Sequence, residues 1–171
     1  LQVKKVLLSE AVDIKSEYYV SFTIDRNTRS VILMLSASGG MDIEEVARLN
    51  PEKIQRFIID PFIGLPDFLA RQYAFTLFRE IENVNSMAVI LQSLYRLFIE
   101  KDVSLAEINP LVLTNNGTLV AIDGKLVFDD NALYRHPDIS ALNEPTEEER
   151  TEAYARSCGF SYVRMDGSIG C

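Results

Sequence analysis

Two apolar runs on either side of Asn115-Asn116-Gly117 predict a β-hairpin in the segment EINPLVLTNNGTLVAIDGKL, residues 107–126. A three-residue loop with its glycine in the left-handed conformation is a common hairpin connection. Such a loop would pair Thr114 with Thr118 and set the register of both strands. The segment therefore fixes two antiparallel strands and the pairs of residues that face each other across them.

This register brings polar side chains together at the far end of the hairpin. Counted back from the loop, the opposed pairs are Leu113 with Leu119, Leu111 with Ala121, and Asn109 with Asp123. Because directly opposed residues share a face, one surface is expected to carry Glu107, Asn109, Asp123 and Lys125. The opposite face is expected to be apolar and to carry Ile108, Pro110, Val112, Val120 and Ile122.

An amide beside a carboxylate, as in the expected pair of Asn109 and Asp123, suits a hard cation. Mg²⁺ binds oxygen ligands and usually takes only one or two of them from protein, with phosphates and water supplying the rest. The same residues also fit a solvated edge with a cross-strand pair of Glu107 and Lys125, and a two-residue turn would place Asn109 diagonally to Asp123. Pro110 removes one ladder donor, which indicates an edge or a bulge.

The rest of the chain predicts an α+β fold, in which helices pack on an antiparallel or mixed sheet. Strands are expected at residues 3–8, 18–24, 31–35, 56–59 and 160–165. The run 31–35 is apolar throughout and is therefore expected to be covered on both faces. Helices are expected after the capping residue Asp42, at Pro51, and over residues 66–79 and 85–100. Gly39-Gly40 fits either a turn before the first helix or a loop that meets a partner subunit.

Composition excludes some classes of function. The formal net charge of −8 argues against nucleic-acid binding, which requires a basic patch. No apolar run reaches the roughly 18 residues that span a bilayer, and no signal-peptide pattern is present. Cys158 and Cys171 form no Cys-x-x-Cys pair, which favours a reducing compartment over a disulfide scaffold. The chain begins without methionine and ends at Gly170-Cys171, so we expect a piece of a longer protein.

Three segments, in order, resemble one known family. The segment AEINPLVLTNNGTLVAIDGKLVFDDNALYRHPD strongly resembles the nucleotide-binding β subunit of succinyl-CoA synthetase, which has an ATP-grasp fold. The segment SEAVDIKSEYYVSFTIDRNTRSVILMLSASGGMDIEEVA matches the same family upstream, and YVRMDGSIGC resembles the first strand of its flavodoxin-like CoA-ligase domain. The resemblance implies the second half of an ATP-grasp domain in 1–142, an acidic linker in 143–159, and the truncated start of the CoA-ligase domain in 160–171.

The family's reaction is acyl-CoA + phosphate + NDP ⇌ carboxylic acid + CoA + NTP, with ATP or GTP as the nucleotide. A phosphohistidine on the partner α subunit carries the phosphoryl group, so the resemblance implies phosphoryl transfer between that histidine and Mg²⁺-nucleotide. Asn109 and Asp123 correspond to the family's Mg²⁺ ligands, and Glu107 corresponds to the carboxylate near the visiting phosphohistidine. This chain's only histidine, His136, is expected to have a structural role in a loop.

The segment LLSEAVDIKSE resembles the part of the family that contacts adenine and ribose. Its implied contact points are Ser9 and Val12, mainly through their backbone, and Glu17 through its carboxylate. The family's glycine-rich phosphate loop and its lysine lie in the first half of the ATP-grasp module and have no counterpart in this sequence. The isolated chain is therefore expected to be inactive and to bind nucleotide poorly.

Two other functions also fit these residues. Parts outside this chain choose the acid, so another ATP-grasp CoA ligase, such as malate–CoA ligase or ATP-citrate lyase, is one alternative. A non-catalytic ATP-grasp module that only holds a partner chain is the other. The family implies the bacterial cytoplasm or the mitochondrial matrix, and the cytoplasm is favoured. The sequence does not distinguish ATP from GTP.

Overall fold

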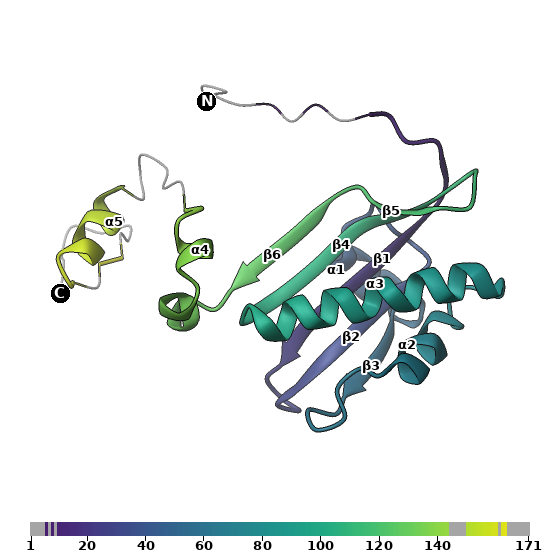
Figure 1. Ribbon diagram of the computed structural model, residues 1–171, viewed down its shortest axis with the longest axis horizontal. Coiled ribbons are helices and arrows are strands. Elements are labelled where there is room, and N and C mark those ends of the chain that lie inside the picture. Colours follow the sequence, from purple (N-terminus) through teal and green to yellow (C-terminus); the bar gives the residue numbers. More distant parts are fainter. Residues whose placement is uncertain (1–5, 7, 9, 144–149, 161, 164–171) are drawn as a thin grey trace. The chain divides into compact units, whose positions relative to one another are not determined.

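The computed structural model describes residues 6, 8, 10–143, 150–160, 162 and 163 (Figure 1). The chain divides into two units, Leu1–Ala132 and Leu133–Cys171. The first unit contains the sheet and its main helices, and it holds every described residue of the predicted site. The predicted strand at residues 3–8 falls largely outside the described residues, and Val6 and Leu8 are not in a strand.

The described residues of the first unit form a six-stranded antiparallel sheet. Its strands are β1 (Ile14–Asp25), β2 (Ser30–Ser36), β3 (Gln55–Ile59), β4 (Val103–Thr114), β5 (Leu119–Ala121) and β6 (Gly124–Phe128). The strand order is β3-β2-β1-β4-β5, and β6 pairs with the first part of β4. The long strands β1 and β4 are therefore neighbours at the centre of the sheet, and the predicted hairpin lies along one of them.

Side-chain chemistry determines where β1 and β2 meet. The carboxylate of Asp25 accepts hydrogen bonds from the Asn27 amide and the Thr28 hydroxyl and so holds the predicted turn. In β2, Leu33 and Leu35 are fully buried, whereas the alternate residues Ile32 and Met34 are only half-buried. The prediction that both faces of this strand are covered is therefore wrong, because the two long helices of the first unit pack on one face only.

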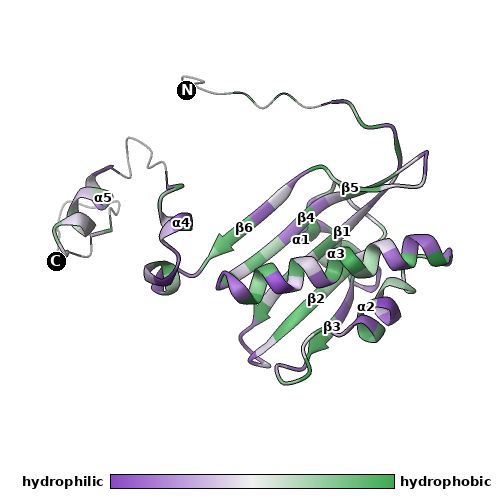
Figure 2. Cartoon of the chain, in the orientation of Figure 1, coloured by the Kyte–Doolittle hydropathy of each residue, from purple (hydrophilic) through white to green (hydrophobic). Residues whose placement is uncertain are grey.

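Two helices, α2 (Asp67–Ala74) and α3 (Ile81–Glu100), lie across one face of the sheet (Figure 1). Apolar and polar residues alternate along α3 (Figure 2), as expected for a helix with one buried stripe. That stripe is Val84, Met87, Ala88, Leu91, Leu94 and Phe98. It packs with the inward residues of the strands into one core. We call the side of the sheet that faces this core the helix-covered face.

Both long helices differ from their predicted bounds at one end. The helix predicted over 66–79 ends at Ala74, where the chain turns and brings Phe78 against Tyr18 with ring centroids 4.7 Å apart. The helix predicted over 85–100 begins four residues earlier, at Ile81. Its extra turn buries Val84 completely and so lengthens the apolar stripe.

The other face of the sheet, which we call the open face, is approached by a loop that follows β2. This loop leads into α1 (Ile43–Leu49), and Asp42 accepts a hydrogen bond from the Glu44 amide as the predicted cap of that helix. The predicted helical turn at Pro51 is the 3-10 helix η1 (Pro51–Lys53). Glu45 of α1 and Lys53 of η1 line a small hollow together with Met41 of this loop.

The second unit contains short helices. Helix η2 (Asp130–Arg135) leads into it, followed by α4 (Pro137–Ser140) and α5 (Arg150–Ser157). The predicted strand at 160–165 lies mostly outside the described residues, and its three described residues are not in a strand. Cys158 is a free, exposed thiol, and Cys171 lies outside the described residues. Among the described helices, none combines the length and apolar character needed to cross a bilayer.

Candidate functional site

The predicted hairpin is present, and its register is as expected. The Thr114 amide donates to the Thr118 carbonyl at 2.9 Å, and Leu113 and Leu111 face Leu119 and Ala121. Farther from the loop, the Asn109 amide donates to the Asp123 carbonyl at 3.2 Å. Glu107 and Lys125 are a directly opposed pair between β4 and β6. The four polar residues therefore lie where the three-residue loop predicts them along the strands.

A β-bulge interrupts β4 at Asn109-Pro110. Tyr18 faces Leu111 and Val20 faces Ile108, so two steps along β1 correspond to three steps along β4. Asn109 and Pro110 thus lie opposite the single residue Tyr19. Pro110 has no amide hydrogen to donate to the ladder. The sequence-based indication of an edge or bulge at this proline is confirmed as a bulge.

The bulge changes which residues share a face. Before it, Ala106 and Ile108 belong to the core on the helix-covered face, and after it Leu111 and Leu113 do. Val112, directly opposed to Glu17 on β1, therefore lies on the open face. The prediction that Ile108 and Val112 share one apolar face is wrong, because the extra residue shifts the two-residue alternation by one.

Glu107 lies half-buried on the open face and receives a hydrogen bond from within the sheet. The Tyr19 hydroxyl donates to its Oε2 atom at 3.1 Å. Burial raises the pKa of Tyr19, the nearby Ser21 hydroxyl lowers it in part, and the Glu107 carboxylate raises it again. The net effect is a raised pKa, so this phenol keeps its proton and remains a donor at neutral pH.

The Asn109 side chain binds the loop that follows β2. Its Oδ1 accepts the Gly40 amide at 2.8 Å, and its Nδ2 donates to the Met41 carbonyl at 3.0 Å. These two partners fix which end of the amide is oxygen, because one is a donor and the other an acceptor. The oxygen keeps a second lone pair, so the side chain can hold the loop and still offer one ligand atom.

Glu17 and the two glycines complete this part of the open face. The Gly39 amide donates to the Glu17 carbonyl at 3.2 Å. A Cβ at Gly39 would lie 2.5 Å from the Tyr18 carbonyl oxygen, and one at Gly40 would lie 2.7 Å from the Glu17 carboxylate. Gly40 also has a φ of +67°, in the left-handed region that favours glycine. The predicted turn at Gly39-Gly40 is thus confirmed: backbone contact excludes a side chain at Gly39, and the positive φ favours glycine at Gly40.

Asp123 and Lys125 are exposed at the rim of this cluster. In the described part of the chain, the Asp123 carboxylate makes no hydrogen bond, and Glu107 and Lys125 form no ion pair although they are opposed. No group of three His, Cys, Asp or Glu residues capable of holding a metal occurs among the described residues. The amide oxygen of Asn109 and the carboxylate of Asp123 nevertheless fit Mg²⁺, which takes few ligands from protein when phosphates are present.

The predicted nucleotide contacts divide between two places. Val12 lies in a groove of about 530 Å³ between residues 10–13 and the hairpin loop at 114–116. The Asn115 amide donates to the Asp13 carbonyl at 3.3 Å and joins the two walls. Glu17 does not line this groove and lies instead beside Gly40. Ser9 lies outside the described residues.

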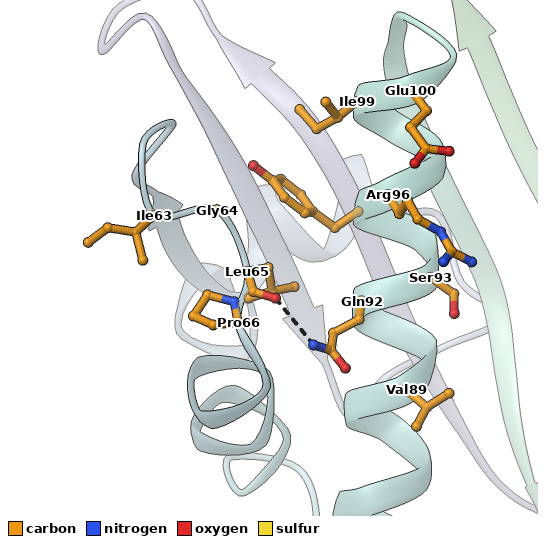
Figure 3. Close-up of a pocket in the computed structure, with 11 residues that line it drawn as sticks. Ile63, Gly64, Leu65, Pro66, Val89, Gln92, Ser93, Arg96, Ile99 and Glu100 are labelled. Atoms are coloured by element: carbon orange, nitrogen blue, oxygen red, sulfur yellow. Dashed lines mark hydrogen bonds between the residues drawn. The ribbon is translucent and has the colours of Figure 1, made fainter.

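A groove of about 640 Å³, larger than the one around Val12, lies elsewhere. It lies between α3 and residues 63–66, where Gln92 Nε2 donates to the Leu65 carbonyl at 3.4 Å (Figure 3). None of the predicted site residues lines it. Its size therefore does not mark the cluster on the open face.

Sequence reasoning missed two participants in the site, Tyr19 and Met41. Tyr19 had a usable signal, because strand alternation places it with Glu17 and Ser21 on the face opposite Val20 and Phe22. Met41 takes part through its backbone carbonyl, so its residue type carried no signal.

Comparison with known proteins adds to this geometry. Residues 1–113 match the family described as ATP-grasp domain. The whole chain is 70% identical over 171 residues to the subunit beta of an ADP-forming succinate–CoA ligase from Bacteroides thetaiotaomicron, of which it covers 46%. It is 51% identical over 170 residues, 99% of its length, to the subunit of that name from Brevibacillus brevis, of which it covers 44%. The chain thus spans about half the length of these curated relatives.

Among solved structures, the ATP citrate lyase from Methanothrix soehngenii in complex with citrate and coenzyme A has a similar fold. The TM-score is 0.60 at 21% sequence identity, over 85% of this chain and 34% of that one. At this identity the likeness concerns the fold alone.

Proposed function

Because the chain belongs to the ATP-grasp domain family, we propose that it is part of the β subunit of an ADP-forming succinate–CoA ligase. The observation that carries the proposal is 70% identity to such a subunit along the whole chain. The complete reaction would be succinyl-CoA + phosphate + ADP ⇌ succinate + CoA + ATP. This chain's share would be phosphoryl transfer between the nucleotide and a phosphohistidine of the partner α subunit.

Asn109 and Asp123 would hold Mg²⁺ through one oxygen each, and the bound ion would offset the charge of the nucleotide phosphates. The Asn109 amide is well suited to this task because Gly40 and Met41 already fix its orientation. Glu107, on the same strand as Asn109, would accept a hydrogen bond from a ring N–H of the visiting histidine and so orient the imidazole. The chain therefore contributes position and charge rather than a covalent intermediate.

The nucleotide would extend from the Val12 groove to the Glu107–Asn109 cluster. Ser9 and Val12, mainly through their backbone, and Glu17, through its carboxylate, would contact the adenine and ribose. The groove around Val12 supports the first of these contacts. We further propose the cytoplasm as compartment, and a division into ATP-grasp residues 1–142, a linker at 143–159 and the start of a CoA-ligase domain at 160–171.

The proposal is tested with the full-length protein and its α subunit, by measuring acid-dependent formation of acyl-CoA and nucleoside diphosphate. Succinate, malate and citrate are compared, each with Mg²⁺-ATP and Mg²⁺-GTP. We expect turnover with succinate and a preference for ATP. If only malate or only citrate were turned over, that acid would replace succinate as the proposed substrate. Nucleotide binding without acyl-CoA formation from any of the three acids would favour a non-catalytic module.

A further inference from the structure

The Glu107 carboxylate is held at one oxygen only. Its Oε2 accepts the Tyr19 hydroxyl at 3.1 Å, and no other hydrogen bond or ion pair reaches this side chain within the described part of the chain. The carboxylate is half-buried on the open face, so its other oxygen is left for a group arriving from outside. A carboxylate with a hydrogen bond at one oxygen has fewer orientations than a free one. The bond therefore helps to determine the direction in which the other oxygen points.

Tyr19 is itself fixed. It lies in the middle of the central strand β1, faces Ser36 of β2, and is only 1% exposed. The phenol must cross from β1 toward β4 to reach a residue 88 positions later in the chain. Burial raises the pKa of Tyr19, so its hydroxyl stays protonated and remains a hydrogen-bond donor throughout the neutral range. A buried ring on a rigid strand therefore presents a hydroxyl at a constant place.

Ser21 offers the Glu107 carboxylate a competing partner within the sheet. It is directly opposed to Glu107 across β1 and β4 and is fully buried. Its Oγ atom nevertheless has no hydrogen-bond partner of good geometry. Without the Tyr19 hydroxyl, the carboxylate would be free to turn toward Ser21, because a buried hydroxyl without a partner gains free energy from an acceptor.

We propose that Tyr19 is the positioning residue for Glu107, holding Oε2 so that Oε1 faces the histidine that exchanges the phosphoryl group. The inference rests on the proposed function, since Glu107 must meet that histidine for its orientation to matter. Tyr19 does not touch the substrate in this account and acts only through Glu107.

The test uses the full-length protein with its α subunit and follows phosphorylation of the α-subunit histidine by labelled Mg²⁺-ATP. Tyr19→Phe keeps the buried ring and removes only the hydroxyl. We expect it to lower the limiting rate about 10-fold, the scale of supporting hydrogen bonds around a site, and to leave the nucleotide KM unchanged. Tyr18→Phe is the matched control, because Tyr18 packs against Phe78 on the helix-covered face; its rate should equal the wild-type rate.

Glu107→Gln separates this inference from the proposed function. We expect that variant to be slow, and Tyr19→Phe to have less than about a 2-fold further effect in its background, because interacting residues are non-additive. If Glu107→Gln retains the wild-type rate, the proposed role of Glu107 fails. If Glu107→Gln is slow but Tyr19→Phe matches wild type, or slows both backgrounds equally, the positioning role of Tyr19 is wrong and the proposed function stands.

Discussion

Replacing Asp123 with alanine in the full-length protein is expected to reduce phosphorylation of the α-subunit histidine about 100-fold or more. The reason is that Asp123 would supply the only carboxylate among the two proposed metal ligands. Its side chain is exposed and makes no hydrogen bond in the described part of the chain. The hydrogen bond from the Asn109 amide is to the backbone carbonyl of residue 123, so alanine keeps it. The unfolding free energy should therefore change by less than about 0.5 kcal/mol.

Two further variants serve as comparisons for Asp123→Ala. Glu82→Ala removes an exposed carboxylate from α3 and should leave phosphorylation unchanged. Asn109→Ala should lose activity and also stability, because it deletes the two bonds to Gly40 and Met41 at about 1 kcal/mol each. Wild-type phosphorylation by Asp123→Ala would remove Asp123 from the metal site.

The second large effect is expected in stability. Gly39→Ala should lower the free energy of unfolding by about 3 kcal/mol, measured as a lower urea midpoint with an unchanged slope. The new Cβ would lie 2.5 to 2.7 Å from three backbone atoms of Tyr18, and backbone in the central strand cannot move aside as a flexible side chain can. The same clash would displace the loop that Asn109 holds.

Gly124→Ala is the control for this prediction. A Cβ there meets only the Glu107 carbonyl, at 3.7 Å, which is ordinary contact. Its stability should stay the same or rise by a few tenths of a kcal/mol, because alanine narrows the unfolded ensemble. Equal stability of Gly39→Ala and Gly124→Ala would show that the loop does not pack against β1 as described.

The hairpin could be predicted because its information is local. Asn115-Asn116-Gly117 specifies the loop length, and the register of both strands then follows by counting. The opposed pair of Glu107 and Lys125 was found in this way. Pro110 indicated an edge or a bulge. A missing amide donor does not show where the extra residue lies, however, so the faces of the residues beyond the bulge were predicted wrongly.

The contacts that orient the site could not be predicted. The Asn109 bonds to the loop span 69 and 68 residues, and the bond from Tyr19 to Glu107 spans 88. They depend on β1 lying between β2 and β4, and this strand order follows from the packing of the whole unit rather than from any one motif. The sequence therefore showed which residues of the hairpin face each other, but it did not show which other strands and loops lie beside the hairpin.

The central claim is that Asn109 and Asp123 hold a metal ion against the nucleotide phosphates. The most direct measurement is the affinity of the full-length protein for ADP with and without Mg²⁺, in wild type and in the two alanine variants. The account predicts that Mg²⁺ tightens ADP binding in wild type and that both variants lose this coupling while keeping metal-free binding. If both variants retain the wild-type gain from Mg²⁺, the claim is contradicted.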